Sequence, residues 1–257
     1  MEIDFHDRSN RMTYARRTAA DDWARLMRAL GGGEGLRVAD VGCGGGIYSA
    51  AWLDLGAASV VGLDFSAAML SGARENCGDR DRLSFRQADA YATGLDDASV
   101  DVVFARALIH HLDDLDACFA EAARVLAPSG RLIVQDRTIE DVTRPGSPSH
   151  LRGYFFERFP FLLDSERARR PSSAAAVRAM TGAGLHSVEV HTLRETRRVY
   201  GGAEEVRQDL LARTGRSILH LLDDEQLGEL ADFVVERLGG AGGVRECDDW
   251  TVWVATK

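Results

Sequence analysis

Apolar and polar residues follow two different rhythms between residues 36 and 136. Five short runs are rich in valine, leucine and isoleucine, a composition typical of strands buried on both faces of a sheet. They lie at 36–41, 60–63, 83–85, 100–105 and 132–134. Between the last two runs, apolar residues recur every three or four positions over 115–126 and predict an amphipathic helix that stops at 128–130. This alternation predicts an α/β fold with a Rossmann-like, doubly wound and mostly parallel sheet.

The flanking segments are expected to extend this core. A helix with Trp23 and Met27 on its apolar face ends at three glycines, 31–33. Residues 137–171 combine prolines with an aromatic cluster interleaved with arginines, which indicates a loop or short-helix insertion. A helix near 173–181 and a strand near 186–190 resume the rhythm. A further helix at 223–238 opens with Asp223 and Gln226 as a capping-box pair, and alternation over 250–255 predicts a last, antiparallel strand.

Composition and charge narrow the classes of function. The chain has 257 residues, 45% of them hydrophobic, and 31 basic against 40 acidic side chains give a net charge of −9. Nucleic acid is not expected as a partner, because phosphate contacts need a clustered basic face. The sequence has no apolar run of membrane-spanning length and no signal-peptide pattern at its start, so we expect no membrane contact and a cytoplasmic protein. The four cysteines lie far apart without a C-x-x-C pair and predict neither disulfides nor a metal site.

A glycine-rich turn follows the first predicted strand. The strand runs into Gly42-Cys43-Gly44-Gly45-Gly46, and a helix is expected from Ile47. Glycines at such a turn let the backbone fold tightly and come close to a ligand. The spacing differs from the G-x-G-x-x-G of nicotinamide dinucleotide sites, since residue 47 is isoleucine. Asp64 ends the next strand, where a carboxylate can accept hydrogen bonds from both ribose hydroxyls, so the turn and the acid together indicate a nucleoside ligand.

These residues resemble the class I S-adenosylmethionine-dependent methyltransferases, and five motifs carry the resemblance from 38 to about 136. Asp40 and the glycines resemble the first motif and Asp64 the acidic ribose ligand, while 87–90, 100–106 and 124–132 resemble the later motifs. The resemblance implies S-adenosylmethionine as the cofactor, with Phe65 and Met69 beside its adenine. The residues expected at the cofactor are Asp40, Gly42, Cys43, Gly44, Gly46, Asp64, Phe65, Met69, Asp89, Ala90, Arg106 and His111.

Several of these residues have a plainer alternative role. Asp40 is expected to order the glycine turn or to meet the cofactor's amine through water, and scaffolding of the turn is the alternative. Asp64 could instead cap the helix near residue 67, a role that Ser66 also fills. Asp89 is expected to accept a hydrogen bond from the adenine amino group, or is an ordinary turn residue. Cys43 is expected to fill space, because methyl transfer from a sulfonium needs no covalent intermediate.

Two histidines follow the fourth predicted strand, at the sheet edge where ligands bind in such folds. An alcohol or phenol must lose a proton when it is methylated, and histidine suits that task near neutral pH. Asp136 ends the adjacent fifth strand and could orient the imidazole. We therefore predict His110 or His111 as a general base with Asp136. The alternative is that these histidines pack under the cofactor, His111 under its methionine part.

The expected organisation is one domain of residues 1–257. Residues 1–34 form an N-terminal lid helix, 35–136 the cofactor-binding core, and 137–171 and 192–243 insertions on the substrate side. Tyr14 and Arg17 are expected to meet the cofactor carboxylate. The residues expected to line the acceptor pocket are Arg152, Tyr154, Phe155 and Phe159. The alternative is that the aromatic residues form the lid's own small core.

The sequence thus predicts S-adenosylmethionine-dependent methylation of a small molecule, at oxygen. Methylation at nitrogen or carbon is one alternative, and a non-catalytic protein that senses the cofactor is another. An NAD(P)-dependent oxidoreductase is disfavoured by Ile47. A shared fold does not fix the substrate, so the acceptor and the oligomeric state stay open.

Overall fold

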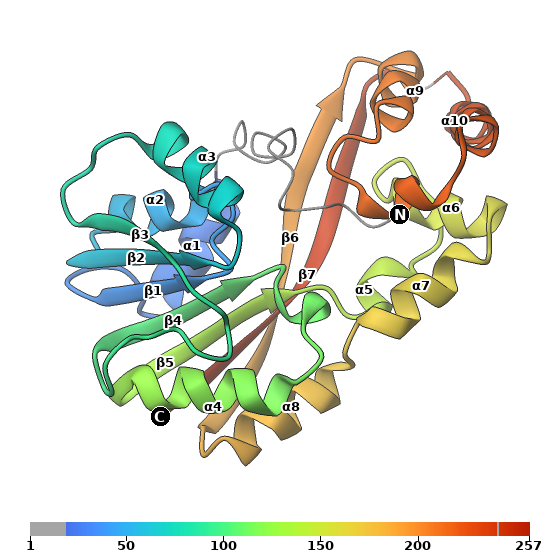
Figure 1. Ribbon diagram of the computed structural model, residues 1–257. Helices are drawn as coiled ribbons and strands as arrows, with labels where there is room; N and C mark the ends of the chain where they lie inside the picture. Colours follow the sequence, from blue (N-terminus) through green and yellow to red (C-terminus); the bar gives the residue numbers. More distant parts are fainter. Residues whose placement is uncertain (1–18, 241) are drawn as a thin grey trace. The chain divides into compact units, whose positions relative to one another are not determined.

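The computed structural model describes residues 19–240 and 242–257 (Figure 1). Tyr14 and Arg17 lie outside this part of the chain. The chain divides into two compact units, and two of the boundaries between them fall inside long strands, at 193/194 and 250/251. The core unit holds the described residues up to Asp136, together with Pro171–Leu193 and Thr251–Lys257. The insertion unit holds Arg137–Arg170 and Arg194–Trp250. Whether the chain acts as one domain stays a prediction.

A seven-stranded sheet has the order β3-β2-β1-β4-β5-β7-β6. Its strands are β1 (Arg37–Val41), β2 (Ser59–Asp64), β3 (Leu83–Gln87), β4 (Val100–Arg106), β5 (Leu126–Asp136), β6 (His186–Tyr200) and β7 (Val244–Thr256). The strands from β3 to β5 pair in parallel, whereas β7 pairs antiparallel with β5. The predicted doubly wound α/β sheet, mostly parallel with an antiparallel last strand, is confirmed.

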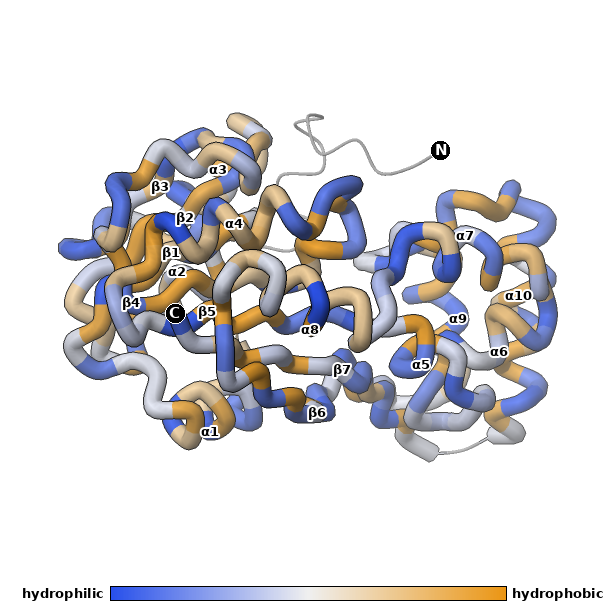
Figure 2. Tube along the Cα trace, turned by 90° about the horizontal axis from the view of Figure 1, so that it is seen from below, coloured by the Kyte–Doolittle hydropathy of each residue, from blue (hydrophilic) through white to orange (hydrophobic). Residues whose placement is uncertain are grey.

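Helices cover both faces of the sheet in the core unit. They are α1 (Asp21–Ala29), α2 (Ile47–Asp54), α3 (Ala67–Cys77), α4 (Leu115–Val125) and α8 (Ser173–Gly182). On one face, Phe119 of α4 and Met180 of α8 join the buried strand residues in one hydrophobic cluster. Figure 2 shows the apolar character of the central strands β1, β4 and β5 beneath these helices. The central strands β1, β4 and β5 are largely buried on both sides, which explains their apolar runs.

The described part of the predicted lid helix belongs to the core. Trp23 of α1 is fully buried and packs edge-on against Trp52 and Phe104, with ring centroids 5.5 and 5.8 Å apart. Met27, one helical turn later, is also fully buried. The apolar face that the sequence indicated therefore covers the sheet, since an amphipathic helix buries its apolar stripe wherever a sheet face is available.

The insertion unit has a hydrophobic core of its own. Its helices are α5 (Ile139–Val142), α6 (Leu151–Arg158), α7 (Leu162–Arg169), α9 (Ala203–Leu211) and α10 (Asp224–Leu238), with a 3₁₀ turn, η3 (Ser217–Leu221). Residues of α6, α7, α9 and α10 form one buried cluster. The predicted capping box is present: Gln226 N donates to Asp223 Oδ1 at 2.8 Å, and Asp223 N donates to Gln226 Oε1 at 3.1 Å.

Three element boundaries differ from the predicted ones. Helix α4 ends at Val125 because β5 already begins at Leu126, and the predicted stop at 128–130 is wrong. Strand β6 continues to Tyr200, and β7 begins at Val244. The added strand residues are largely charged, so they lack the apolar alternation that indicates a strand. They are stabilised across the sheet instead, as by Arg197 Nη1 of β6 and Glu246 Oε2 of β7 at 2.8 Å.

Candidate active site

The turn between β1 and α2 has a backbone that only glycine adopts readily. Gly42, Gly44 and Gly46 have φ values of +73°, +51° and +78°. A Cβ on Gly46 would lie 2.8 Å from Cys77 Sγ and from the Phe85 ring. The chain here is therefore folded tightly against α3 and β3.

Asp64 holds this turn at the end of β2. Its Oδ2 accepts a hydrogen bond from Gly44 N at 2.9 Å, and its Oδ1 accepts one from Ser66 N at 2.9 Å. Ser66, and not Asp64, is the cap of α3, since Ser66 Oγ accepts from Met69 N at 3.2 Å. The capping role considered for Asp64 is therefore filled by Ser66. Phe65, next in sequence, leaves 49% of its surface exposed, which provides an apolar face beside the carboxylate.

Asp40 is buried next to the turn and has a partner that the sequence did not reveal. Ser49 Oγ of α2 donates a hydrogen bond to Asp40 Oδ2 at 2.5 Å. Burial raises the pKa of the Asp40 carboxyl to about 7; nearby Asp64 raises it further, while Ser49 and Arg106 oppose the shift. The signal that could have indicated Ser49 is a lone polar residue in the otherwise apolar start of α2.

The segment after β3 forms a turn at the surface. Asp89 is exposed, and its Oδ1 accepts a hydrogen bond from Tyr91 N at 2.9 Å. The hydroxyl of Tyr91 in turn accepts from the backbone nitrogens of Asp113 and Asp114, at 3.1 and 3.3 Å. The contact fixes the turn beside the loop that follows the histidines. The adenine contacts expected of Asp89 and Ala90 stay predictions.

The structure brings His110 and Asp136 together. His110 lies in a 3₁₀ turn, η2 (Ile109–His111), directly after β4, and Asp136 is the last residue of the neighbouring β5. His110 Nδ1 is 2.8 and 2.9 Å from the two carboxylate oxygens of Asp136, and His110 N donates to Oδ2 at 3.3 Å. The surface of His110 is 9% exposed and that of Asp136 1%. His111 is exposed, with its ring centroid 4.0 Å from that of His110.

At the end of β4, the guanidinium of Arg106 lies 4.3 Å from the Tyr48 ring centroid.

The residues expected around the acceptor lie on and after α6, in the insertion unit. Three aromatic residues are buried there: Tyr154, Phe155 and Phe159 are 6%, 0% and 9% exposed. All three belong to the buried cluster of that unit. The sequence had left open that these aromatic residues form a small core of their own. Their role in acceptor binding stays a prediction. Arg152 is also buried but is paired with Glu166, at 3.2 Å.

Comparison with known proteins identifies the core. Residues 39–134, from β1 to β5, match the family described as "Methyltransferase domain". These residues are similar to methyltransferase domains, and the similarity covers 96 of the chain's 257 residues. Such domains use S-adenosylmethionine as the methyl donor. The match includes the glycine turn, Asp64 and His110.

Relatives of the methyltransferase domain occur in several bacteria. The ubiquinone biosynthesis O-methyltransferase of Chelativorans sp. (strain BNC1) is 33% identical over 125 residues, 48% of this chain and 49% of that protein. The 27-O-demethylrifamycin SV methyltransferase of Amycolatopsis mediterranei (strain S699) is 35% identical over 105 residues, 40% and 39% of the two chains. This chain therefore spans half or less of the length of these relatives.

A solved structure shows the same fold over the whole chain. Phosphoethanolamine N-methyltransferase 2 of Haemonchus contortus, in complex with S-adenosyl-L-methionine, has a TM-score of 0.61 and 19% identity. The similarity covers 99% of this chain and 60% of that one. At this identity the comparison concerns the fold.

The residues of the methyltransferase domain fit S-adenosylmethionine. The three glycines have positive φ, so the turn after β1 folds as tightly as a ligand-binding turn requires. Asp64 presents a carboxylate to the same turn, and the half-exposed Phe65 adds an apolar surface of the kind that an adenine ring needs. One polar and one apolar group thus lie next to each other in sequence at the end of β2.

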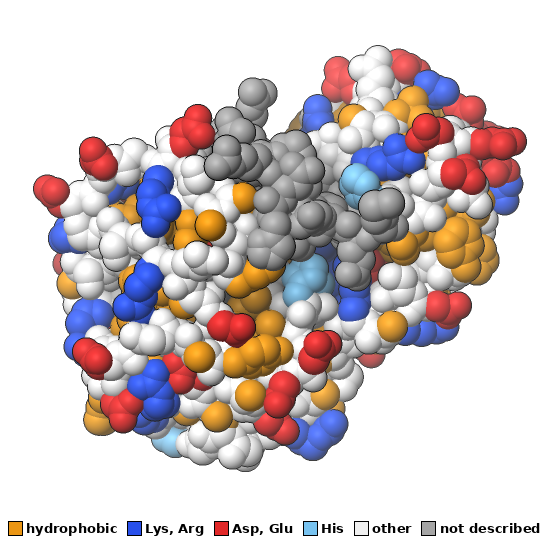
Figure 3. Space-filling view, in the orientation of Figure 1, with side chains coloured by type: hydrophobic (Ala, Val, Ile, Leu, Met, Phe, Trp, Pro, Cys, Tyr) orange, Lys and Arg blue, Asp and Glu red, His pale blue; other side chains and the backbone are white. Residues whose placement is uncertain are grey.

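The described residues contain no group of three or more His, Cys, Asp or Glu side chains that could hold a metal ion. None of the helices in the described segments combines the length and the apolar character that a membrane crossing needs. On the face shown in Figure 3, arginine side chains are interspersed with aspartate and glutamate. A nucleic-acid site would instead need basic side chains gathered on one face.

Proposed function

We propose that this chain transfers the methyl group of S-adenosylmethionine to a hydroxyl oxygen of a small molecule, with His110 as the general base. The observation that carries the proposal is the contact of His110 Nδ1 with both carboxylate oxygens of Asp136, at 2.8 and 2.9 Å. A base oriented by a buried carboxylate is what an oxygen acceptor needs, because its proton must leave during the reaction.

The cofactor would be held by the glycine turn after β1 and by Asp64 and Phe65 at the end of β2. Gly42, Gly44 and Gly46 would let the backbone approach the methionine part, and Asp64 would accept hydrogen bonds from the ribose hydroxyls. Phe65 would pack against the adenine. When bound, S-adenosylmethionine supplies an electrophilic methyl group on a sulfonium centre.

Asp136 would fix both the orientation and the tautomer of His110. A carboxylate at Nδ1 favours the proton on that nitrogen, so Nε2 carries the lone pair that would accept the hydroxyl proton. The imidazolium that results would be stabilised by the Asp136 carboxylate in a largely buried site, where such a pair interacts more strongly than in water.

The names of the relatives support oxygen as the acceptor atom. One is called a ubiquinone biosynthesis O-methyltransferase, and the other acts, by its name, on 27-O-demethylrifamycin SV. Both names describe small molecules rather than macromolecules. The net charge of −9 also supports a small molecule over a nucleic acid.

Binding of S-adenosylhomocysteine, measured by isothermal titration, tests the cofactor assignment. Asp64→Asn should bind at least about tenfold more weakly, since hydrogen bonds to a charged acceptor contribute roughly 1.5–3 kcal/mol. Asp101→Asn is the matched control, because Asp101 is also an aspartate of a parallel strand but pairs with Arg37 at the opposite, amino-terminal end of β4. Absence of binding by the wild-type protein would contradict the proposal.

Turnover tests the role of His110. Release of S-adenosylhomocysteine is followed with S-adenosylmethionine and a panel of small alcohols and phenols. His110→Gln and Asp136→Asn should each lower kcat by about 10² to 10⁴ while S-adenosylhomocysteine affinity stays within about twofold. A loss of cofactor affinity equal to the loss of rate would instead make His110 a structural residue.

A further inference from the structure

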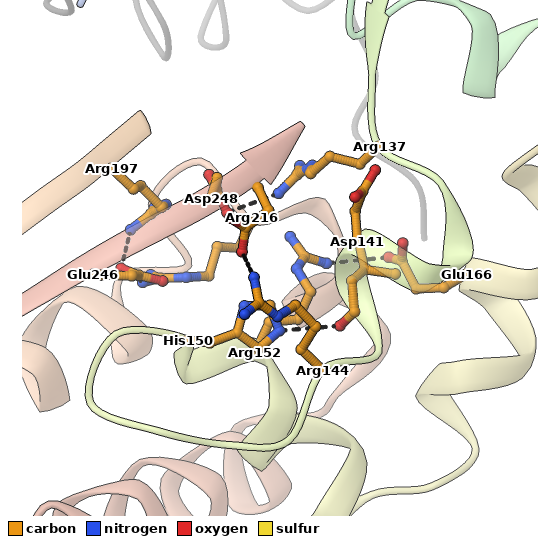
Figure 4. Close-up of polar contacts among 12 residues, drawn as sticks. Arg137, Asp141, Arg144, His150, Arg152, Glu166, Arg197, Arg216, Glu246 and Asp248 are labelled. Carbon is orange, nitrogen blue, oxygen red and sulfur yellow. Dashed lines mark hydrogen bonds and ion pairs between the residues drawn. The ribbon is translucent and has the colours of Figure 1, made fainter. Parts of the chain in front are cut away.

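The insertion unit contains three arginines that share one buried carboxylate. Glu166 of α7 is fully buried, and its Oε1 is 3.2 Å from Arg152 Nη1 of α6 (Figure 4). Arg169 Nη2 and Arg170 Nε also donate to the same carboxylate. Glu166, Arg169 and Arg170 have i, i+3, i+4 spacing, which places the three side chains on one side of the helix end. We call these four residues, Arg152, Glu166, Arg169 and Arg170, the Glu166 cluster.

Arg152 is the least compensated arginine of the Glu166 cluster. Among the described residues its one hydrogen-bond partner is Glu166, at 3.2 Å, and that carboxylate is already shared with two closer arginines. Arg169 donates to Glu166 and, at 3.4 Å, to Ser217 Oγ, while its buried Nε has no hydrogen-bond partner in the described part of the chain. Buried charged groups in proteins are normally paired, and here three guanidinium groups share a single glutamate.

Arg216, in the same unit, shows what full compensation looks like. Its guanidinium donates to Asp209, to Glu246 at 2.7 Å and to the Tyr200 hydroxyl at 3.1 Å. The side chain is 2% exposed, against 10% for Arg152. Arg216 is therefore closed off among its own partners, whereas Arg152 has fewer partners and remains partly accessible.

The pKa values of the two guanidinium groups agree with this contrast. Burial, together with the charges of Arg137 and Arg170, lowers the pKa of Arg152 to about 9, although Glu166 and Asp248 oppose the shift. Burial also acts to lower the pKa of Arg216, but Glu246, Tyr200 and Asp209 raise it above the ordinary value. The guanidinium of Arg152 is therefore less well compensated for its burial than that of Arg216.

We propose that Arg152, with Arg169 beside it, binds an oxyanion of the methyl acceptor, so that the acceptor is an acidic small molecule. This inference rests on the proposed function for the identity of the ligand. The planar guanidinium fork matches carboxylate and phosphate oxygens equally, so either group satisfies the geometry. The Arg152 side chain is 10% exposed, so it is not closed off from a small oxyanion.

Matched pairs of charged and neutral probes test the inference by titration of the full-length protein at constant ionic strength. Benzoate is compared with benzamide, and phenyl phosphate with phenol. The wild-type protein should bind at least one charged probe about tenfold more tightly than its neutral counterpart, and the stronger pair identifies carboxylate or phosphate. Equal binding within both pairs would overturn the inference. No detectable binding of either anion at about 50 mM would also overturn it.

Variants locate the effect. Arg152→Met should lose the preference for the charged probe and should fold, because Glu166 keeps Arg169 and Arg170. Arg152→Lys retains the charge without the fork and should keep a reduced preference. Arg198→Met is the control, since Arg198 pairs with Asp209 in the same unit and is half exposed. A preference that survives in both Arg152 variants would make Arg152 a structural partner of Glu166.

S-adenosylhomocysteine titration on the same samples separates the two proposals. If S-adenosylhomocysteine binds and the anions do not, the inference about Arg152 fails while the proposed function stands. If S-adenosylhomocysteine does not bind, the proposed function fails, whatever the anions do.

Discussion

Asp40 and Asp64 lie near the carboxyl ends of neighbouring strands and differ in how their charge is compensated. Asp64 accepts hydrogen bonds from two backbone nitrogens of the turns around it. Asp40 is buried beside the Ser49 hydroxyl, and burial raises the pKa of its carboxyl to about 7. The two acids therefore lie in different surroundings, although the sequence presents them as two similar strand-end aspartates.

The raised pKa of Asp40 predicts a pH-dependent stability. In the unfolded chain the carboxyl ionises near 3.8, whereas the folded state keeps its proton up to about pH 7. Because the folded state binds more protons in that window, this residue lowers the free energy of unfolding as the pH rises from 4 to 7, by at most about 4 kcal/mol, and changes nothing above pH 7.

Asp40→Asn should remove this decline. Denaturant unfolding at pH 5 and pH 8 should show the variant gaining stability relative to the wild type as the pH rises. Asp101→Asn should show a constant difference between these pH values, because Arg37 lowers the pKa of Asp101 and its carboxyl is ionised at both. A pH-independent difference for Asp40→Asn would show that Asp40 is ionised in the folded protein.

Residues on adjacent parallel strands could be paired from the sequence, and residues in the insertion unit could not. His110 and Asp136 were expected together because β4 and β5 end at the same sheet edge, and Arg106 is paired with Gln135 in their register. The contact of Arg152 with Glu166 joins two helices whose packing has no fixed register. In an arginine-rich chain, no local pattern distinguishes Arg152 from arginines on the surface.

Strand lengths were predicted where the strand is apolar and missed where it is charged. Strands β1 to β4 were found to within about two residues, and in β1, β2 and β4 burial on both faces makes the sequence largely apolar. The outer half of β6 reads as polar, yet Arg197 Nη1 reaches Glu246 Oε2 of β7 at 2.8 Å. Cross-strand ion pairs stabilise such a strand only once its partner is in place, so hydropathy along one segment cannot indicate it.

The capping box of α10 is an element whose contribution can be measured. Asp223 Oδ1 accepts from Gln226 N at 2.8 Å, and this bond satisfies a backbone donor that the helix leaves open. Asp223→Ala should lower the free energy of unfolding by about 1 kcal/mol, as measured by denaturant unfolding. Glu225→Ala is the control, because Glu225 is exposed in the same helical turn and its removal changes the charge equally without removing the cap. Equal losses would assign the effect to the helix dipole.

Each of the two compact units has its own hydrophobic core. One buried cluster joins strands β1, β2, β4, β5 and β7 to helices α4 and α8, and all its residues belong to the core unit. The other cluster joins α6, α7, α9 and α10 and lies within the insertion unit. The residues matched as a methyltransferase domain, 39–134, fall entirely in the core unit. The predicted cofactor residues that the structure describes therefore depend on one core, and Arg152 on the other.

Separate cores predict separate responses to substitution, which native-state hydrogen exchange can follow. Leu230 of α10 is fully buried in the insertion unit, and Leu132 of β5 is 1% exposed in the core unit. Replacing a buried leucine by alanine costs about 2–5 kcal/mol. Leu230→Ala should speed exchange in α6, α9 and α10 and leave S-adenosylhomocysteine affinity intact. Leu132→Ala should speed exchange in β1, β4 and β5. S-adenosylhomocysteine at 100 times its Kd should slow exchange in the core unit about 100-fold, which corresponds to about 2.7 kcal/mol in the free energy of opening. If either substitution speeds exchange equally along the whole chain, the two units unfold together and do not differ in stability.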